Sequence, residues 1–276
     1  MPSRLIPFFA LLVSFSVSNL AISQMIVGHR GASYDAPENT LAAFQLAWDQ
    51  NADGIEGDFY LTRDAKIVCI HDRDTKRTTG ANLRVEDSTL AELRKLDAGQ
   101  WKDPKWDSER IPTFAEVLQT VPEGRTFVIE IKSDRKLVPH LKAELDRLDH
   151  SKIKLLIICF DEHVIADCKR LLPEVKAHWL TGFKQNKLTQ SWTPTADHIS
   201  KVVKRSGADG VGMQGQTRVI NADFIDALKQ GECDEFHVWT INSATDARFF
   251  ASVGAFGITT DRPAMIRDAL EPVASR

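Results

Sequence analysis

Histidine and carboxylate side chains fall at the ends of short apolar runs in the first half of the chain. The histidines are His29 and His71, and the acids are Glu56, Asp58 and Glu130. Because the pKa of histidine is about 6.5, the pair suits proton transfer at neutral pH. Three carboxylates brought together would repel one another unless a positive charge lay among them, and hard divalent cations prefer oxygen ligands. The residue types therefore indicate acid-base chemistry assisted by a divalent cation.

Two cationic residues adjoin this set. Arg30 follows His29 directly, and Lys132 follows the third acid on the same face of its strand. Arginine binds phosphate oxygens through a bidentate fork and lysine acts as a point charge, so the pair suits an anionic phosphate ester. Arg30 shares a site with His29 only if the backbone leaves strand geometry, which Gly31 would allow. Otherwise we expect Arg30 to pair with an acid such as Glu38.

Simpler interpretations of the same residues remain open. Glu56 and Asp58 could pair with lysine or arginine at the surface, and their spacing alone is a common pattern. A histidine at a strand end is often only a structural hydrogen-bonding residue. We give that interpretation to His237, although it shares a strand face with Trp239, and to the other five histidines of the chain: His140, His150, His163, His178 and His198.

Apolar runs that alternate with helical patterns must position these residues. Eight strands are predicted at 25–28, 55–61, 126–131, 154–160, 176–180, 208–212, 235–241 and 255–259. Helical spacing follows each of them, and eight such units in one domain of ~250 residues predict a (β/α)8 TIM barrel. An open doubly wound sheet is the alternative. The polar stretch 72–111 is predicted to be a small insertion after the second strand. Active sites of such barrels lie at the C-terminal strand ends, where the candidate residues are placed.

Composition limits the classes of function. The chain has 276 residues and a net charge of -3, and no block of lysine and arginine indicates nucleic-acid binding. Its four cysteines match no metal or redox spacing and are expected to be small buried hydrophobic residues: Cys69, Cys159, Cys168 and Cys233.

The first 24 residues differ in kind from the rest. Arg4 precedes an apolar stretch at 5–17, and Ala21 and Ser23 supply small residues before Gln24. This pattern is typical of an export signal removed near Ser23 or Gln24, which would leave 25–276 as a single periplasmic or secreted domain. The alternative, a membrane anchor, is less favoured because the apolar stretch is shorter than the ~20 residues that span a bilayer.

Short motifs follow one another in order along the chain. They are HRGAS at 29–33, PENTLAAF at 37–44, DGIEGD at 53–58, LTRD at 61–64, HD at 71–72, RTTG at 77–80, PTF at 112–114, EIK at 130–132, VWTIN at 238–242 and GITTDRP at 257–263. Together they strongly resemble the motifs of the glycerophosphodiester phosphodiesterase family. The resemblance covers all of the chain after the predicted signal and is weak from about 135 to 205.

This resemblance implies a TIM barrel with an insertion after the second strand. It also implies hydrolysis of glycerophosphodiesters to glycerol 3-phosphate and an alcohol with one divalent cation, often calcium or magnesium. Carried over position by position, the resemblance makes His29 and His71 the acid-base pair. It makes Glu56, Asp58 and Glu130 the metal ligands, Arg30 and Lys132 the phosphate contacts, and Trp239 a residue on the glycerol side.

Few residues depart from the family pattern. Ala65 stands where glycine is usual and Phe59 where valine is common, and Trp239 could simply pack on the barrel rim. Alternatives to this function are a phospholipase D acting on lysophospholipid or sphingomyelin, a broader phosphatase or nuclease, and an exported protein that captures phosphodiesters. The sequence leaves open the head group, the metal, the roles of the two histidines, water or the glycerol 2-hydroxyl as nucleophile, and the oligomeric state.

Overall fold

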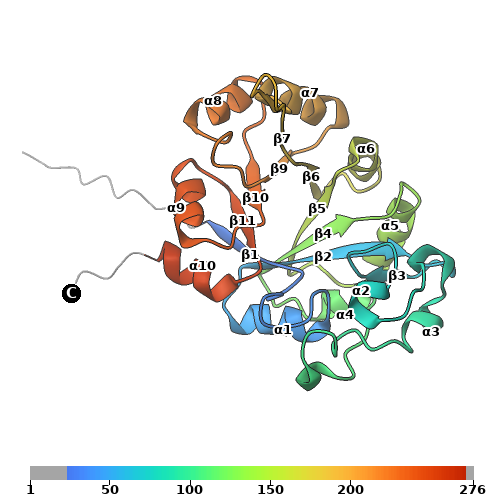
Figure 1. The fold of residues 1–276 in the computed structure, drawn as a ribbon. Helices are drawn as coiled ribbons and strands as arrows, with labels where there is room; N and C mark the ends of the chain where they lie inside the picture. The colour runs from blue at the N-terminus through green and yellow to red at the C-terminus, as the bar shows by residue number, and fades with distance from the viewer. Residues whose placement is uncertain (1–23, 272–276) are drawn as a thin grey trace, which may run out of the picture.

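Eight parallel strands close into a barrel in a computed structural model that describes residues 24–271 (Figure 1). Each strand pairs in parallel with the next, and β1 pairs with both β2 and β11, which closes the sheet. The predicted TIM barrel is thereby confirmed. Around the barrel the strands are β1 Met25–His29, β2 Gly54–Leu61, β4 Thr126–Ile131, β5 Lys154–Cys159, β6 Lys176–Thr181, β9 Gly210–Gln214, β10 Phe236–Trp239 and β11 Gly257–Thr260.

Helices surround the barrel. They are α1 Leu41–Asp49, α4 Phe114–Gln119, α5 Leu137–Arg147, α6 Glu162–Leu171, α7 Ala196–Ser206, α8 Ala222–Gln230, α9 Ala244–Ser252 and α10 Pro263–Leu270. Side-chain caps set where several of them begin. Thr40 accepts from the Ala43 amide, so α1 starts three residues later than residue 38, where helical spacing begins in the sequence. Thr113 and Glu116 form a reciprocal capping box at the start of α4.

Buried hydrophobic residues form two large clusters between strands and helices and a smaller one inside the barrel. In the first large cluster, Phe59 packs edge-on against Phe114 and Phe127 with ring centroids 5.4 and 5.8 Å apart. The smaller cluster fills the inside of the barrel with Val27, Val128, Leu156, Ile158 and Leu180. The barrel is therefore a packed scaffold that holds the C-terminal strand ends in fixed positions.

The polar stretch after β2 folds against the barrel. β2 continues past Asp58 to Leu61, where it pairs antiparallel with β3 (Ile67–Cys69). Beyond β3 come α2 Lys76–Thr79, η1 Val85–Asp87, α3 Leu90–Leu93 and η2 Pro104–Trp106. Tyr60, Val68 and Leu93 belong to a separate small hydrophobic cluster under this stretch. The fold of β3 and of this stretch places His71, which follows β3, beside the C-terminal ends of the barrel strands. The short hairpin of β7 (Lys184–Gln185) and β8 (Trp192–Thr193) was not predicted, because its sequence is mostly polar.

All four cysteines are free and buried, as expected. The predicted signal at 1–24 lies outside the described residues except for Gln24. From residue 24 to residue 271, no helix has the length and apolar character needed to cross a membrane.

Candidate active site

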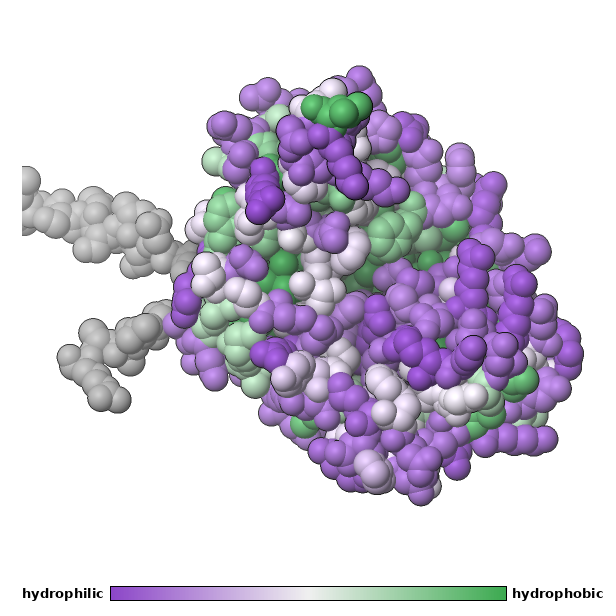
Figure 2. Space-filling model, viewed as in Figure 1, coloured by the Kyte–Doolittle hydropathy of each residue, from purple (hydrophilic) through white to green (hydrophobic). Residues whose placement is uncertain are grey.

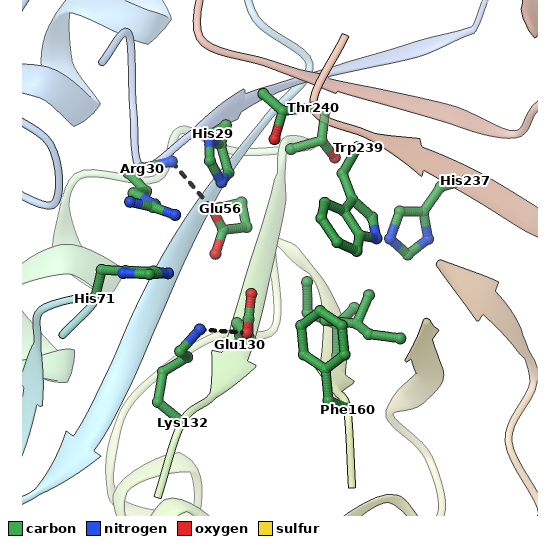
Figure 3. A pocket seen from close by; sticks show the side chains of 13 residues that line it. His29, Arg30, Glu56, His71, Glu130, Lys132, Phe160, His237, Trp239 and Thr240 are labelled. Carbon is green, nitrogen blue, oxygen red and sulfur yellow. Dashed lines mark hydrogen bonds and ion pairs between the residues drawn. The ribbon is translucent and has the colours of Figure 1, made fainter. Parts of the chain in front are cut away.

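A cavity of about 130 Å³ opens at the C-terminal ends of the strands (Figure 3). Side chains of β1, β2, β4, β5, β6, β10 and β11 line it, together with residues that come just after β1, β3, β4, β5 and β10. Seven of the eight sequence-predicted site residues are among them: His29, Arg30, Glu56, His71, Glu130, Lys132 and Trp239. The eighth, Asp58, lies behind this surface in contact with Arg30 and Lys132. The barrel therefore brings the whole predicted set to one mouth.

The three carboxylates form a buried cluster. Asp58 on β2 is in register with Glu130 on β4, and Glu56 lies on the same face of β2. One oxygen from each lies within 4.8 Å of the others. Glu56 Oε1 and Asp58 Oδ1 are buried without a hydrogen-bond partner in the described part of the chain. Buried acceptors of this kind need a cation or a proton, so the cluster fits a divalent ion.

Crowding of negative charge changes how these acids titrate. Burial raises the pKa of Glu56, and the charges of Asp58 and Glu130 raise it further. Burial and the charge of Asp58 raise the pKa of Glu130 to about 7. Burial would also raise the pKa of Asp58, but Arg30 and Lys132 outweigh it and the pKa is lowered. The cluster therefore carries less negative charge at neutral pH than three free carboxylates would.

The positively charged side chains of Lys132 and Arg30 contact this cluster. Lys132 Nζ lies 2.9 Å from Glu130 Oε1 and 3.5 Å from Asp58 Oδ1. Arg30 Nε lies 3.2 Å from Asp58 Oδ2, an ion-pair contact without hydrogen-bond alignment. Each cation therefore keeps donors that are free to bind a ligand anion beside the carboxylates.

The backbone at Arg30 decides where its side chain points. Arg30 and Gly31 have φ of 57° and 83°, so the chain leaves strand geometry directly after His29. The Arg30 amide donates to Glu56 Oε2 at 3.0 Å, and its guanidinium donates to Glu38 at 2.9 Å. Both outcomes considered from the sequence are therefore present: Arg30 enters the site and pairs with Glu38.

Each histidine is held by a carboxylate through Nδ1. His29 Nδ1 lies 2.7 Å from Asp261 Oδ1, and His71 Nδ1 lies 2.7 Å from Asp72 Oδ1. Figure 3 shows His29 and His71 on the same side of the cavity as Glu56. Burial lowers the pKa of His71. With Nδ1 engaged, Nε2 of each ring is the atom left for proton transfer.

Sequence reasoning missed the residues that orient the site. Asp261 accepts hydrogen bonds from His29, Ser33 and Asn242. These interactions overcome the effect of burial and lower its pKa to about 2. Asn39 makes two hydrogen bonds with Asp58. Its Nδ2 donates to Asp58 Oδ2 at 2.8 Å, and its Oδ1 accepts from the Asp58 amide at 3.2 Å. Both residues sit in motifs that matched the family, but nothing in their spacing indicated which side chains they would contact.

An apolar wall faces the charged residues. Trp239 and Phe160 pack edge to face with centroids 5.5 Å apart, and Ile158 and Leu180 continue the wall into the barrel. Figure 3 shows Trp239 and Phe160 across the cavity from His71 and Lys132. The site thus has one face for an anion and one for a carbon skeleton.

Comparisons with known proteins agree with this geometry. The sequence pattern of the glycerophosphoryl diester phosphodiesterase family matches residues 29–265. A Bacillus subtilis protein provisionally named glycerophosphodiester phosphodiesterase is 35% identical over 244 residues, covering 87% of this chain and 96% of that protein. A glycerophosphodiester phosphodiesterase of Caldanaerobacter subterraneus is 32% identical over 243 residues, covering 87% and 94%. The solved structure of an Oleispira antarctica phosphodiesterase in complex with the product sn-glycerol-3-phosphate superposes with a TM-score of 0.78 at 25% identity, covering 91% of this chain and 97% of that one.

Proposed function

The chain belongs to the glycerophosphoryl diester phosphodiesterase family, whose members are phosphoric diester hydrolases, and we propose that it hydrolyses glycerophosphodiesters with the help of a divalent cation. The products are glycerol 3-phosphate and an alcohol. The observation that carries the proposal is the gathering of three acids, two cations and two carboxylate-held histidines around one cavity.

Glu56, Asp58 and Glu130 are the residues that would hold the cation. Support comes from the two buried carboxylate oxygens that lack a hydrogen-bond partner in residues 24–271 and from a donor set made only of oxygen. When bound, a calcium or magnesium ion supplies Lewis acidity toward a phosphate oxygen. Arg30 and Lys132 bind the remaining phosphate oxygens and stabilise negative charge as the bond breaks.

His29 and His71 move the protons. One ring takes the proton from the attacking hydroxyl, and the other gives a proton to the departing alcohol oxygen. The carboxylates of Asp261 and Asp72 hold the two rings through Nδ1, so that Nε2 stays available. Replacing either histidine by alanine should lower kcat on the order of 10²-fold or more.

The cavity supports a small, polar substrate. Its volume of about 130 Å³ suits a glycerol phosphate unit better than a long acyl chain. Figure 2 shows that the face in view is mostly hydrophilic, with hydrophobic residues gathered near its centre. We therefore place glycerophosphodiesters ahead of lysophospholipids or sphingomyelin as substrates.

The test is a panel of glycerophosphodiesters incubated with the purified protein, with EDTA or with added calcium or magnesium. Glycerol 3-phosphate is followed with a coupled dehydrogenase, and a lysophospholipid with the same head group is compared. Release of glycerol 3-phosphate that EDTA abolishes and metal restores is the expected result. Binding of the diesters without release, or full activity in EDTA, would reject the proposal.

We also propose that the protein is exported and that the signal is removed near Ser23 or Gln24. The support is the composition of the first 24 residues. Cell fractionation with mass measurement of the mature chain tests this, and a full-length chain retained inside the cell would contradict it.

A further inference from the structure

Two buried histidines inside the barrel have no part in the proposed mechanism. His178 on β6 and His237 on β10 are almost fully buried, with stacked rings whose centroids lie 5.2 Å apart. β9, the strand between them, leaves room for both rings. A Cβ at Gly210 would lie 2.8 Å from His178 Nε2, and one at Gly212 would lie 2.3 Å from His237 Nε2. His237 also lines the active-site cavity.

A hydrogen-bonded chain determines which nitrogens of this pair carry hydrogen. His178 Nε2 lies 3.0 Å from Glu235 Oε1, and Lys176 Nζ lies 2.7 Å from Glu235 Oε2. The ion pair with Lys176 keeps Glu235 in its charged form, and a charged carboxylate can only accept hydrogen bonds. His178 Nε2 is therefore the protonated nitrogen of that contact.

The contact between the two rings then fixes His237. The Nδ1 atoms of His178 and His237 lie 3.0 Å apart, so one donates to the other. A neutral His178 that donates through Nε2 has a lone pair at Nδ1, and His237 Nδ1 is then the donor. This leaves His237 Nε2 as an unprotonated acceptor. With both rings neutral, no imidazolium has to be buried inside the barrel. Burial lowers the pKa of His237 to about 3, and the neighbouring His178 contributes to this shift.

A hydrogen-bond donor, the indole of Trp239, lines the same cavity as the acceptor His237 Nε2. Trp239 lies two residues after His237 on the same face of β10 and lines the same cavity. Its Nε1 is buried and has no hydrogen-bond partner in residues 24–271. The hydrogen bond found for His237 in the same residues uses Nδ1, so Nε2 is the ring nitrogen left for a ligand. Figure 3 shows both side chains on the side of the cavity away from His71 and Lys132.

We propose that His237 Nε2 and Trp239 Nε1 form a subsite that binds one hydroxyl group of the glycerol unit. A hydroxyl donates one hydrogen bond and accepts another, so it complements one acceptor and one donor. The inference rests on the proposed function, because glycerol is the part that all glycerophosphodiesters share while their alcohols differ. His178 and Glu235 are positioning residues that hold His237 in the accepting tautomer.

This subsite should discriminate against ligands that lack the hydroxyl. A deoxy ligand would leave His237 Nε2 and Trp239 Nε1 without their partner, which should weaken binding on the order of tenfold. The probes are sn-glycerol 3-phosphate and two analogues: 3-hydroxypropyl phosphate, without the 2-hydroxyl, and 2-hydroxypropyl phosphate, without the terminal hydroxyl. One of the two analogues should bind about tenfold more weakly than sn-glycerol 3-phosphate.

Nuclear magnetic resonance of the full chain with isotope-labelled histidine tests the tautomers without any substitution. We expect His178 protonated at Nε2 and His237 protonated only at Nδ1. Addition of sn-glycerol 3-phosphate should shift the His237 Nε2 resonance, and the weaker analogue should not. A protonated His237 Nε2 in the free protein, or equal affinity for all three ligands, would overturn the proposal.

Substitutions give a second test. His237→Phe keeps an aromatic ring but removes the acceptor, so it should raise KM for glycerophosphodiesters about tenfold with little change in kcat, and abolish the discrimination. Glu235→Gln should weaken the discrimination between sn-glycerol 3-phosphate and the deoxy analogue. The glutamine amide can donate to or accept from His178 Nε2, so it accommodates either tautomer of His178. His198→Phe, at an exposed histidine on α7, is the control, with melting temperatures to check folding. A wild-type protein that hydrolyses no glycerophosphodiester rejects the proposed function, whereas hydrolysis without discrimination rejects only the subsite.

Discussion

His29 Nδ1 lies 2.7 Å from the Asp261 carboxylate, although 232 residues separate them in the chain. Asp261 directly follows β11, and β11 pairs in parallel with β1, which ends at His29. Closure of the barrel therefore creates this contact. A carboxylate at Nδ1 fixes the orientation of the ring and stabilises the imidazolium that forms when Nε2 takes up a proton.

Replacing this carboxylate should slow the reaction. Asp261→Asn keeps the shape of the side chain but removes the charge, so kcat should fall on the order of tenfold to hundredfold with little change in KM. Steady-state kinetics measures it. Asp268→Asn, at an exposed position on α10, is the matched control and should leave kcat unchanged. If the Asp261→Asn variant kept the kcat of the wild type, His29 would not depend on a charged carboxylate at Nδ1.

Removing one acid from the buried cluster should stabilise the metal-free protein while abolishing activity. Burial and the neighbouring Asp58 and Glu130 raise the pKa of Glu56, so its charged form is costly without a cation. Glu56→Gln in EDTA should therefore gain on the order of 1 kcal/mol in the free energy of unfolding.

With metal bound, the wild type should become more stable than the Glu56→Gln variant. At a concentration 100-fold above its Kd, a cation stabilises the wild type by about 2.7 kcal/mol, and the Glu56 variant should lose most of that gain. Thermal unfolding with EDTA, calcium or magnesium measures both effects, with Glu174→Gln at an exposed acid as control. An equal metal-induced rise in Tm for wild type and variant would contradict the assignment.

The buried His237 should make stability depend on pH. Burial lowers its pKa in the folded protein to about 3, whereas its pKa in the unfolded chain is about 6.5. Between these values the unfolded state binds more protons, so stability falls as pH falls, with a slope of up to about 1.4 kcal/mol per pH unit from this group.

Comparison with His237→Phe isolates this contribution, because the raised pKa of Glu130 acts in the opposite direction over part of the same range. Urea unfolding between pH 7 and pH 4 should show a smaller loss of stability in the variant. Parallel pH profiles for the two proteins would mean that His237 titrates normally when folded.

A departure from the family pattern offers a stabilising substitution. Ala65 lies in the turn between β2 and β3 with φ of 58°, a left-handed conformation that glycine adopts without strain. Ala65→Gly should therefore raise the free energy of unfolding by about 0.5 to 1 kcal/mol. The control is Ala227→Gly in the exposed interior of α8, which should lower it by about 1 kcal/mol. Chemical denaturation measures both, and destabilisation by Ala65→Gly would refute the explanation.

Elements with strong local patterns were predictable from the sequence. The eight strands and their helices follow from apolar runs and helical spacing, and most boundaries agree with the structure within about two residues. The β7–β8 hairpin was missed because it is polar and carries no alternating pattern. The strand predicted at 55–61 agrees with β2, Gly54–Leu61, but its antiparallel pairing with β3 was not predicted.

The sequence by itself determined which residue types were available and that strand ends would present them at one mouth, because side chains alternate along a strand and active sites of barrels lie at one end. It did not determine which side chains would meet across distant strands. Asp261 lies beside His29 because the barrel closes between β1 and β11. The His178–His237 pair depends on the space left by Gly210 and Gly212, and Asn39 contacts Asp58 because of how the loop after β1 folds. Only the tertiary structure decides such contacts, because they join residues whose separation in the chain carries no signal of their distance in space.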